Sequence, residues 1–321
     1  MEVCQHINRE DWNDLLLHSD YANYFQTPDY YDFLCTQAEL QPFCLAVCEQ
    51  HVPMALLCGY VLADGNPLKA YFSRRAVAQG GVLLRREAKG EHLNCLLQEL
   101  RKLLGKRVIY IEIRNFLDYA AFKKPMAEEG FHYQPHYDIH VPIGSREEVM
   151  NRMDEPKRRQ IKRAYAQGES WRATCSTDDL RTFYRILQQL YRTKVHRPLF
   201  PIRFFEDLLA TEHAYLLVTE DASGTITGGM FCVGYERKVL YEWFVCGDVM
   251  ATWAGLDFAA ENGFGCFDFM GAGVPGRPYS VRDFKMRFGG TLYEYGRFLY
   301  IANPFLYRLG EWVVKHWKAL V

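Results

Sequence analysis

The segment from Phe267 to Gly290, FDFMGAGVPGRPYSVRDFKMRFGG, has residue types that could serve acyl transfer. A predicted strand ends in Gly-Ala-Gly, and the loop after it leads into a predicted helix that carries Lys285. Glycines at a strand end let the backbone approach a ligand closely, and a helix start offers free N–H groups to an anion. The lysine could contact a phosphate or stabilise a developing oxyanion. A tight turn with a surface lysine would give the same pattern.

The same segment resembles the C-terminal signature of the FemABX family. Its members have tandem GNAT-like domains and transfer an amino acid from aminoacyl-tRNA to a peptidoglycan precursor. The residues that follow the family pattern are Phe267, Asp268, Phe269, Gly271, Gly273, Tyr279, Phe284, Lys285, Phe288, Gly289 and Gly290. There is no long insertion for a helical-hairpin arm, so the resemblance is to the shorter, FemX-type architecture.

The resemblance implies roles for the residues of this segment. Lys285 is predicted to stabilise the tRNA phosphate or the tetrahedral oxyanion from an exposed channel wall, and Phe284 is predicted to shape that channel. Further residues are predicted to contact substrate, namely Asp268, Gly271, Gly273 and Tyr279. Because the ester donor is already activated, positioning and charge stabilisation suffice, and neither a cofactor nor a metal is expected.

Two basic stretches extend the resemblance. In HRPLFPIRFF, Arg197 and Arg203 resemble the Arg-x-x-Phe-x-x-Arg part of the family's nucleotide-sugar site, and guanidinium groups suit a diphosphate. In EPKRRQIKRA, the predicted tRNA- or phosphate-binding residues are Lys157, Arg158, Arg159 and Lys162. The alternatives are an exposed loop with two ordinary arginines and a solvated helix face.

The first half departs from the family pattern. Members that act on the nucleotide-linked precursor have a lysine after the second helix, and YYDFLC offers none. They also have an acidic residue at the end of the central strand, where this chain has Arg114. Arg114 is therefore predicted to bind substrate, but a reversed charge would change what binds. This strand end looks closer to FemAB-related proteins found with exopolysaccharide systems.

The order of elements predicts an α+β fold with two tandem GNAT-like domains and a substrate channel between or beside them. The first domain is predicted to span 1–143, closed by a strand at 136–143. The second is predicted to span 144–303, with the Phe-Lys signature and a last strand at 291–301. Residues 304–321 are predicted to form a C-terminal helix docked on the first domain. Its Trp and Lys residues would also suit a membrane surface.

Composition limits the classes of function. The net charge is −1, so any tRNA site must be a local basic patch. The ten cysteines show no disulfide spacing, and the first residues lack the apolar stretch of a signal peptide. We therefore expect a cytoplasmic protein, and contact with the inner face of the membrane is compatible with this expectation. His132, His136 and His140 are four apart, but Pro135 breaks any helix there, so no metal site is expected.

The predicted function is transfer of an amino acid from aminoacyl-tRNA to the stem peptide of a UDP-linked or lipid-linked muropeptide, a step of cell-wall peptidoglycan biosynthesis. The alternative is an N-acyltransferase that uses an acyl-CoA such as acetyl-CoA and acts on an envelope polysaccharide or amino sugar.

Overall fold

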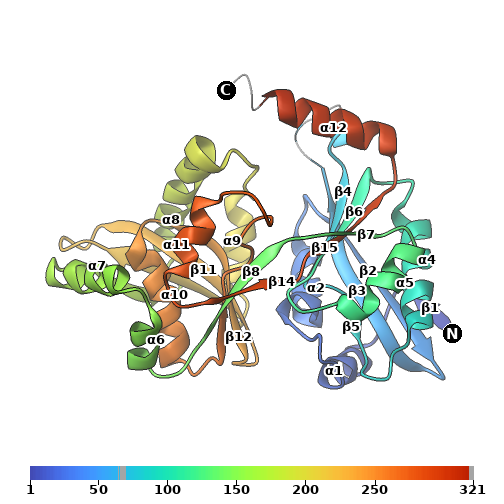
Figure 1. The fold of residues 1–321 in the computed structure, drawn as a ribbon, viewed down its shortest axis with the longest axis horizontal. Helices are drawn as coiled ribbons and strands as arrows, with labels where there is room; N and C mark the ends of the chain where they lie inside the picture. The colour runs from blue at the N-terminus through green and yellow to red at the C-terminus, as the bar shows by residue number, and fades with distance from the viewer. Residues whose placement is uncertain (64, 66–69, 318–321) are drawn as a thin grey trace. The chain divides into compact units, whose positions relative to one another are not determined.

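The computed structural model describes residues 1–63, 65 and 70–317, and it forms two compact units. The first comprises Met1–Pro135 and Tyr295–Val321, and the second comprises His136–Glu294. Each unit contains one mixed β-sheet with helices packed on it (Figure 1). Within the described part of the chain, no helix combines the length and the apolar character needed to cross a bilayer.

In the first unit the sheet has the order β1-β2-β3-β4-β6-β15-β7, with β5 paired to β3. Only the pair β4 and β6 is parallel among the pairings described for this sheet. The strands are β1 (Glu2–Cys4), β2 (Gln41–Glu49), β3 (Val52–Leu62), β4 (Arg75–Gln79), β5 (Leu83–Leu84), β6 (Tyr110–Arg114), β7 (His132–Gln134) and β15 (Arg297–Ile301). The helical segments are α1 (Arg9–Leu17), η1 (Tyr24–Gln26), α2 (Pro28–Thr36), α4 (Gly90–Leu104), η2 (Ala120–Phe122), α5 (Lys123–Glu128) and α12 (Pro304–Trp317).

Helix α4 covers one face of this sheet and α1 and α2 cover part of the other. The α4 leucines recur at helical spacing, and those that are buried are Leu93, Leu96, Leu97, Leu100 and Leu104. They pack with Ile111 and Ile113 of β6, each buried side chain contributing about 1.5–3 kcal/mol. The alternate β6 side chains, Tyr110, Glu112 and Arg114, therefore lie on the opposite face.

In the second unit the sheet has the order β14-β8-β13-β12-β11-β10-β9, and β12 and β13 are parallel. The strands are β8 (Tyr137–Pro142), β9 (Ser170–Thr174), β10 (Ala214–Glu220), β11 (Ile226–Tyr235), β12 (Val239–Cys246), β13 (Cys266–Asp268) and β14 (Thr291–Glu294). The helical segments are α6 (Arg146–Arg152), α7 (Glu155–Ala166), α8 (Thr177–Leu190), η3 (Tyr191–Val195), α9 (Ile202–Leu209), α10 (Val249–Glu261) and α11 (Ser280–Met286).

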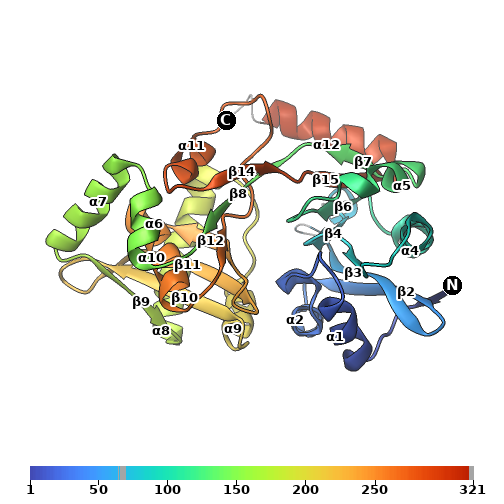
Figure 2. The same cartoon turned by 60° about the horizontal axis from the view of Figure 1, so that its bottom comes forward.

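The two faces of the second sheet bury different helices (Figure 2). Met230 and Cys232 of β11 pack with Trp253 of α10, a helix in which all residues from Met250 to Ala259 are buried. Phe231, between them, points to the other face and packs against Phe205 of α9 at a ring-centroid distance of 5.6 Å. This alternation is the period-2 pattern of a strand buried on both faces.

The division of the chain differs from the predicted boundaries. The strand expected to close the first domain, β8, pairs with β13 and β14 in the second sheet. The strand expected to close the second domain, β15, pairs with β6 and β7 in the first sheet. The predicted domain boundaries after residues 143 and 303 were therefore wrong, because the second unit runs from His136 to Glu294. Alternating apolar residues show that a strand has a buried face, but they do not show which sheet it joins.

Helix α12 belongs to the first unit. In its first turn, Tyr307 packs edge-on against Tyr110 of β6, with ring centroids 5.6 Å apart. Farther along, the apolar side chains of Trp312 and Val313 are exposed. The first turn of α12 thus contacts the first unit. Docking of the whole segment 304–321 on that unit remains a prediction.

Candidate active site at the end of β13

The segment that joins β13 to α11 begins where the two parallel strands of the second sheet separate. The β12–β13 pairing ends at Tyr241 and Asp268, and the chain then turns through Met270, Gly271 and Gly273, all with positive φ. We call residues 269–279 the β13–α11 loop. The carboxyl ends of parallel strands are where α/β sheets bind ligands, so this loop lies where chemistry is expected.

Lys285 of α11 forms hydrogen bonds with the first residues of this loop. Its Nζ lies 2.9 Å from Oε1 of Glu242 on β12, and it donates to the carbonyl oxygens of Phe269 at 2.6 Å and Gly271 at 3.5 Å. The side chains of Lys285 and Glu242 are 10% and 4% exposed. The predicted position on an exposed channel wall was wrong, because the buried carboxylate of Glu242 draws the ammonium inward. A lysine has three N–H donors, and here all three have an acceptor.

Arg282, one turn earlier on α11, holds the rest of the loop in the same way. Its guanidinium donates to the carbonyl oxygens of Ala272 at 3.5 Å, Val274 at 3.3 Å and Arg277 at 2.7 Å. The two cations are three residues apart, so they lie on one face of the helix. Sequence reasoning missed Arg282, although its spacing from Lys285 after a glycine-rich loop was a usable signal.

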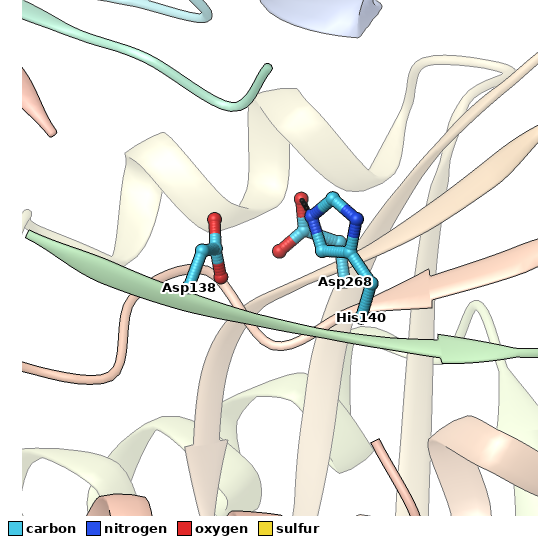
Figure 3. Close-up of side chains that lie close together, drawn as sticks. All are labelled: Asp138, His140 and Asp268. Atoms are coloured by element: carbon cyan, nitrogen blue, oxygen red, sulfur yellow. Dashed lines mark ion pairs between the residues drawn. The ribbon is translucent and has the colours of Figure 1, made fainter. Parts of the chain in front are cut away.

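Three titratable side chains gather beside the loop: Asp138 and His140 from β8, and Asp268 from β13 (Figure 3). His140 and Asp268 are direct partners in the strand pairing, and His140 Nε2 lies 3.3 Å from Asp268 Oδ2. One oxygen of each carboxylate accepts loop N–H groups, from Met270 to Asp268 at 2.6 Å and from Gly271 to Asp138 at 2.9 Å. The carboxylates of the cluster therefore accept hydrogen bonds from the loop's N–H groups, while Lys285 donates hydrogen bonds to its carbonyl oxygens.

The electrostatics of this cluster are unusual. Burial, reinforced by the negative charge of Asp268, raises the pKa of Asp138 to about 8. Burial alone would lower the pKa of His140, but the charge of Asp268 and their hydrogen bond raise it. His140 is also the most exposed of the three, at 16% of its side chain against 2% for Asp268. Since His140 Nε2 is itself buried beside Asp268, proton exchange between His140 and a bound substrate would pass through the other ring nitrogen, Nδ1.

The same three residues could hold a metal ion. Each offers one ligand atom, and these atoms lie within 4.8 Å of one another. Two carboxylates and one imidazole suit a divalent cation such as Mn²⁺ or Zn²⁺. The sequence-based expectation that no metal is bound remains a prediction. Sequence reasoning missed this set because it assigned β8 to the other domain and considered His140 only with other histidines.

The structure places the remaining predicted residues of the loop region as follows. Asp268 is buried and hydrogen-bonded within the protein, so it faces no open solvent. Tyr279 is partly exposed, and its ring lies so close to Gly273 that a Cβ there would be 2.8 Å from it. Phe284 is partly buried, and its ring lies against Phe288 at a centroid distance of 5.2 Å.

The basic helix α7 divides into a buried and an exposed part. Lys157 is buried, with its Nζ 4.0 Å from the centre of the Phe284 ring, and burial followed by the charge of Arg287 lowers its pKa. The expectation that Lys157 contacts tRNA was therefore wrong, since the helix turns it toward the core. Arg159 and Lys162 are exposed, and Arg158 donates to the carbonyl oxygen of Asn151 at 3.0 Å.

Arg197 and Arg203 are both exposed and flank an aromatic stack. Phe200 lies flat on Phe204, with centroids 4.1 Å apart, and Arg203 pairs with Asp207 at 3.5 Å. None of the contacts described for the chain joins either arginine to the β13–α11 loop. The predicted diphosphate site at these residues remains a prediction.

Arg114 lies in the first unit and is half-buried. Both its Nε and Nη2 lie 2.8 Å from Oε2 of Glu112, whose other oxygen lies 2.8 Å from Arg297. The charge of Arg114 is thus shared within a group of three.

A pocket of about 460 Å³ opens elsewhere in the second unit, beside the edge strand β9. One of its lining residues is Asp257, which accepts a hydrogen bond from Trp171 at 3.0 Å and forms an ion pair with Arg146 at 2.9 Å. Burial raises the pKa of Asp257 to about 6. The pocket contains none of the residues predicted to act in catalysis or binding.

Comparisons with known proteins identify the class of fold. Residues 155–285 match the family model described as an acetyltransferase (GNAT) domain. The chain matches none of the curated protein sequences. Among solved structures it resembles FemX, with a TM-score of 0.73 and 15% identity over 96% of this chain and 99% of that one.

Two further structures have lower similarity. One is L-PGS from Bacillus licheniformis, with a TM-score of 0.57 and 13% identity, covering 94% of this chain and 95% of that one. The other is a tandem GNAT protein from the clavulanic acid biosynthesis pathway, with a TM-score of 0.56 and 13% identity, covering 94% and 99%. The chain has a tandem GNAT fold. The predicted α+β architecture of two GNAT-like domains and its likeness in fold to FemX are thereby confirmed, and the match to an acetyltransferase domain bears out the acyltransferase class.

We expect that replacing Lys285 by Met lowers the free energy of unfolding by about 3–5 kcal/mol, because Glu242 is left as a buried, unpaired carboxylate. Burial already raises the pKa of Glu242, so the loss should be smaller at pH 5, where protonation removes the charge, than at pH 8. Urea denaturation at both pH values measures this.

The matched control is Lys238→Met, because Lys238 forms a short but exposed ion pair with Glu236, at 2.6 Å. An exposed pair contributes at most about 1 kcal/mol. Equal, small losses for both variants would show that Lys285 does not stabilise the loop.

A second prediction concerns Asp138, whose pKa in the folded protein is raised to about 8. A carboxyl with a raised pKa binds its proton more tightly in the folded state, so stability falls as pH rises from about 4 toward 8. Asp138→Asn keeps the acceptor for Gly271 and removes the titration. The wild type should therefore lose more free energy of unfolding between pH 5 and pH 8 than the variant. Parallel stability profiles would contradict the raised pKa of Asp138.

Proposed function

We propose that the protein transfers an amino acid from aminoacyl-tRNA to the stem peptide of a peptidoglycan precursor, UDP-linked or lipid-linked. The observation that carries this proposal is the Phe-Lys signature, whose Lys285 holds the β13–α11 loop at the carboxyl end of β13, beside Glu242 of β12. The likeness to FemX over nearly the whole of both chains supports it. The likeness in fold to a domain of a putative lysylphosphatidylglycerol synthetase from Agrobacterium fabrum, with a TM-score of 0.56 and 11% identity, favours an aminoacyl donor.

The reaction needs few groups. The acceptor amine attacks the ester carbonyl carbon, the bond from this carbon to the ribose oxygen breaks, and one proton passes from the amine to that oxygen. His140, whose pKa is raised by Asp268, suits both transfers: as imidazolium it gives a proton to the leaving oxygen, and it then recovers one from the amine nitrogen. Lys285 and Arg282 act as positioning residues, because their N–H groups hold loop carbonyls.

In this proposal the donor, aminoacyl-tRNA, binds to the exposed part of α7. Arg159 and Lys162 would contact tRNA phosphates, together with Arg158 once it exchanges its carbonyl partner. Arg197 and Arg203 would bind the diphosphate of a UDP-linked acceptor. No cofactor takes part, since the ester is already activated. We place the reaction in the cytoplasm and propose that the exposed apolar side of α12 contacts the inner face of the membrane.

The alternative, an acyl-CoA-dependent N-acyltransferase that acts on an envelope polysaccharide or amino sugar, is favoured by two observations. The match of residues 155–285 is to an acetyltransferase domain, and Arg114 replaces the acidic residue expected at the acceptor site.

Thermal unfolding with separate ligands distinguishes the two. A ligand at 100 times its Kd stabilises the native state by about 2.7 kcal/mol. We expect aminoacyl-tRNA and UDP-muropeptide to raise the melting midpoint, and a transfer assay with both to give product. His140→Gln should lower kcat by about 100-fold or more. Stabilisation by acetyl-CoA with no effect of aminoacyl-tRNA would overturn the proposal in favour of the alternative.

A further inference from the structure

The pocket beside β9 is separate from the candidate active site. β9 is the edge strand at the opposite end of the second sheet from β14 (Figure 2), and it lies four strands away from β13. Neighbouring strands are about 4.8 Å apart, so roughly 19 Å separate the two strands. The volume of the pocket, about 460 Å³, is within the range of small-molecule sites. None of the residues that the proposed reaction uses lines it.

The pocket contains a buried carboxylate that uses only one of its two oxygens. The side chain of Asp257 is 1% exposed. Its Oδ2 accepts the Trp171 hydrogen bond at 3.0 Å and lies 2.9 Å from Nη2 of Arg146. Its Oδ1 is also buried, and within the described part of the chain it has no hydrogen-bond partner. A buried carboxylate oxygen without a donor is costly, so an unpaired one in a pocket wall indicates a donor supplied by a ligand.

The charges around Asp257 favour a positively charged donor. Glu261, one turn later on α10, also lines the pocket, and the ion pairs described for the chain include none for it. Two carboxylates four residues apart on a helix repel each other, and the negative end of the helix dipole adds to this. The last turn of α10 contains no basic residue. A cation would relieve this repulsion.

The two arginines of the pocket do not balance these charges. Arg172 is already shared by Asp179 and Glu220, each at 2.8 Å. The lining residues and their ion-pair partners therefore comprise four carboxylates against two guanidinium groups. Burial raises the pKa of Asp257 to about 6, and the charge of Glu261 adds to this, while Trp171 and Arg146 act in the opposite direction. Asp257 is therefore charged at neutral pH.

Aromatic rings form much of the remaining wall. Tyr165, Trp171 and Phe258 line the pocket, and the last two meet edge-on with centroids 6.4 Å apart. The chain's own cation already uses one of these rings, since the guanidinium of Arg146 lies 5.9 Å from the centre of the Tyr165 ring. Aromatic faces attract organic cations and pack against carbon chains. They suit an organic amine better than a metal ion, which keeps oxygen ligands and water around it.

A ligand reaches Oδ1 only if a neighbouring side chain moves, because this oxygen is shielded from solvent. Arg146 is able to move outward without leaving a packed core. Its side chain is 53% exposed, and its described polar contacts are with Asp257 and with the Tyr165 hydroxyl at 3.1 Å. The guanidinium of Arg146 is then a competitor of the ligand for Asp257.

We propose that this pocket binds the ammonium group of a free small organic amine. One N–H of the ammonium donates to Oδ1 of Asp257, the charge of Glu261 adds to the attraction, and the carbon chain lies against the aromatic rings. The inference goes beyond the proposed function and does not depend on it, since it concerns a different part of the second unit.

Nuclear magnetic resonance of the full chain, labelled with ¹⁵N at its six tryptophans, tests this with butylamine at pH 7.5 and constant ionic strength. The indole N–H signal of Trp171, assigned by its loss in Trp171→Phe, should shift in proportion to occupancy. The indole of Trp12, which donates to Gln26 in the first unit at 2.7 Å, should not shift. Tetramethylammonium, which has no N–H, and butanol, which has no charge, should bind at least about tenfold more weakly.

Variants test the role of each charge. Asp257→Asn keeps the shape of the side chain and should weaken butylamine binding by about tenfold or more. Glu261→Gln, an exposed change that leaves the core intact, should weaken it about two- to threefold. Arg146→Gln should tighten it, because the competing cation is removed. The control is Glu128→Gln, which changes the net charge as Glu261→Gln does but lies on α5 of the first unit, and it should leave binding unchanged.

Three results would overturn the inference. One is an unchanged Trp171 signal at saturating butylamine, and another is equal affinity for butylamine and tetramethylammonium. The third is weaker binding in Arg146→Gln, which would show that Arg146 is not a competitor. Tighter binding of the capped peptide acetyl-Gly-Lys-Gly-amide than of butylamine would exclude a free amine as the ligand. Binding of butylamine should also weaken at pH 5, where Asp257 takes up a proton.

Discussion

The ion pair between Lys285 and Glu242 determines the shape of the candidate active site. The β13–α11 loop turns through residues with positive φ and cannot form a regular strand ladder, so its backbone groups need other partners. Side chains of opposite charge supply them. The carboxylates of Asp138 and Asp268 accept from loop amides, while Lys285 and Arg282 donate to loop carbonyls. Glu242 in turn neutralises Lys285, whose ammonium would be costly to bury alone.

The two units use the same structural element for different chemistry. In each sheet one strand of the parallel pair ends in a polar residue on a face that the apolar core leaves uncovered: β6 at Arg114 and β13 at Asp268. In the second unit this residue lies with a second carboxylate and an imidazole beside a glycine-rich loop, which suits proton transfer. In the first it is a guanidinium paired with Glu112. A shared fold therefore explains the positions of both strand ends, and the side chains explain their difference.

The sequence was sufficient for the fold class and for the Phe-Lys segment, because helical spacing, strand alternation and the glycine turn are local signals. It was insufficient for the partners of each strand. β8 and β15 exchange sheets, and only long-range pairing decides this. The same limit hid the burial of Lys285, since Glu242 lies on a different strand, and it hid the meeting of Asp138 with Asp268. Lys157 was misplaced because a run of basic residues does not show which one faces inward.

Amide hydrogen exchange with and without substrate tests the central claim most directly, that the loop after β13 binds the substrate. With a non-hydrolysable aminoacyl-tRNA analogue, the account predicts slower exchange in residues 269–273 of the β13–α11 loop. Protection confined to other regions, such as the pocket beside β9, with this loop unaffected, would contradict the account.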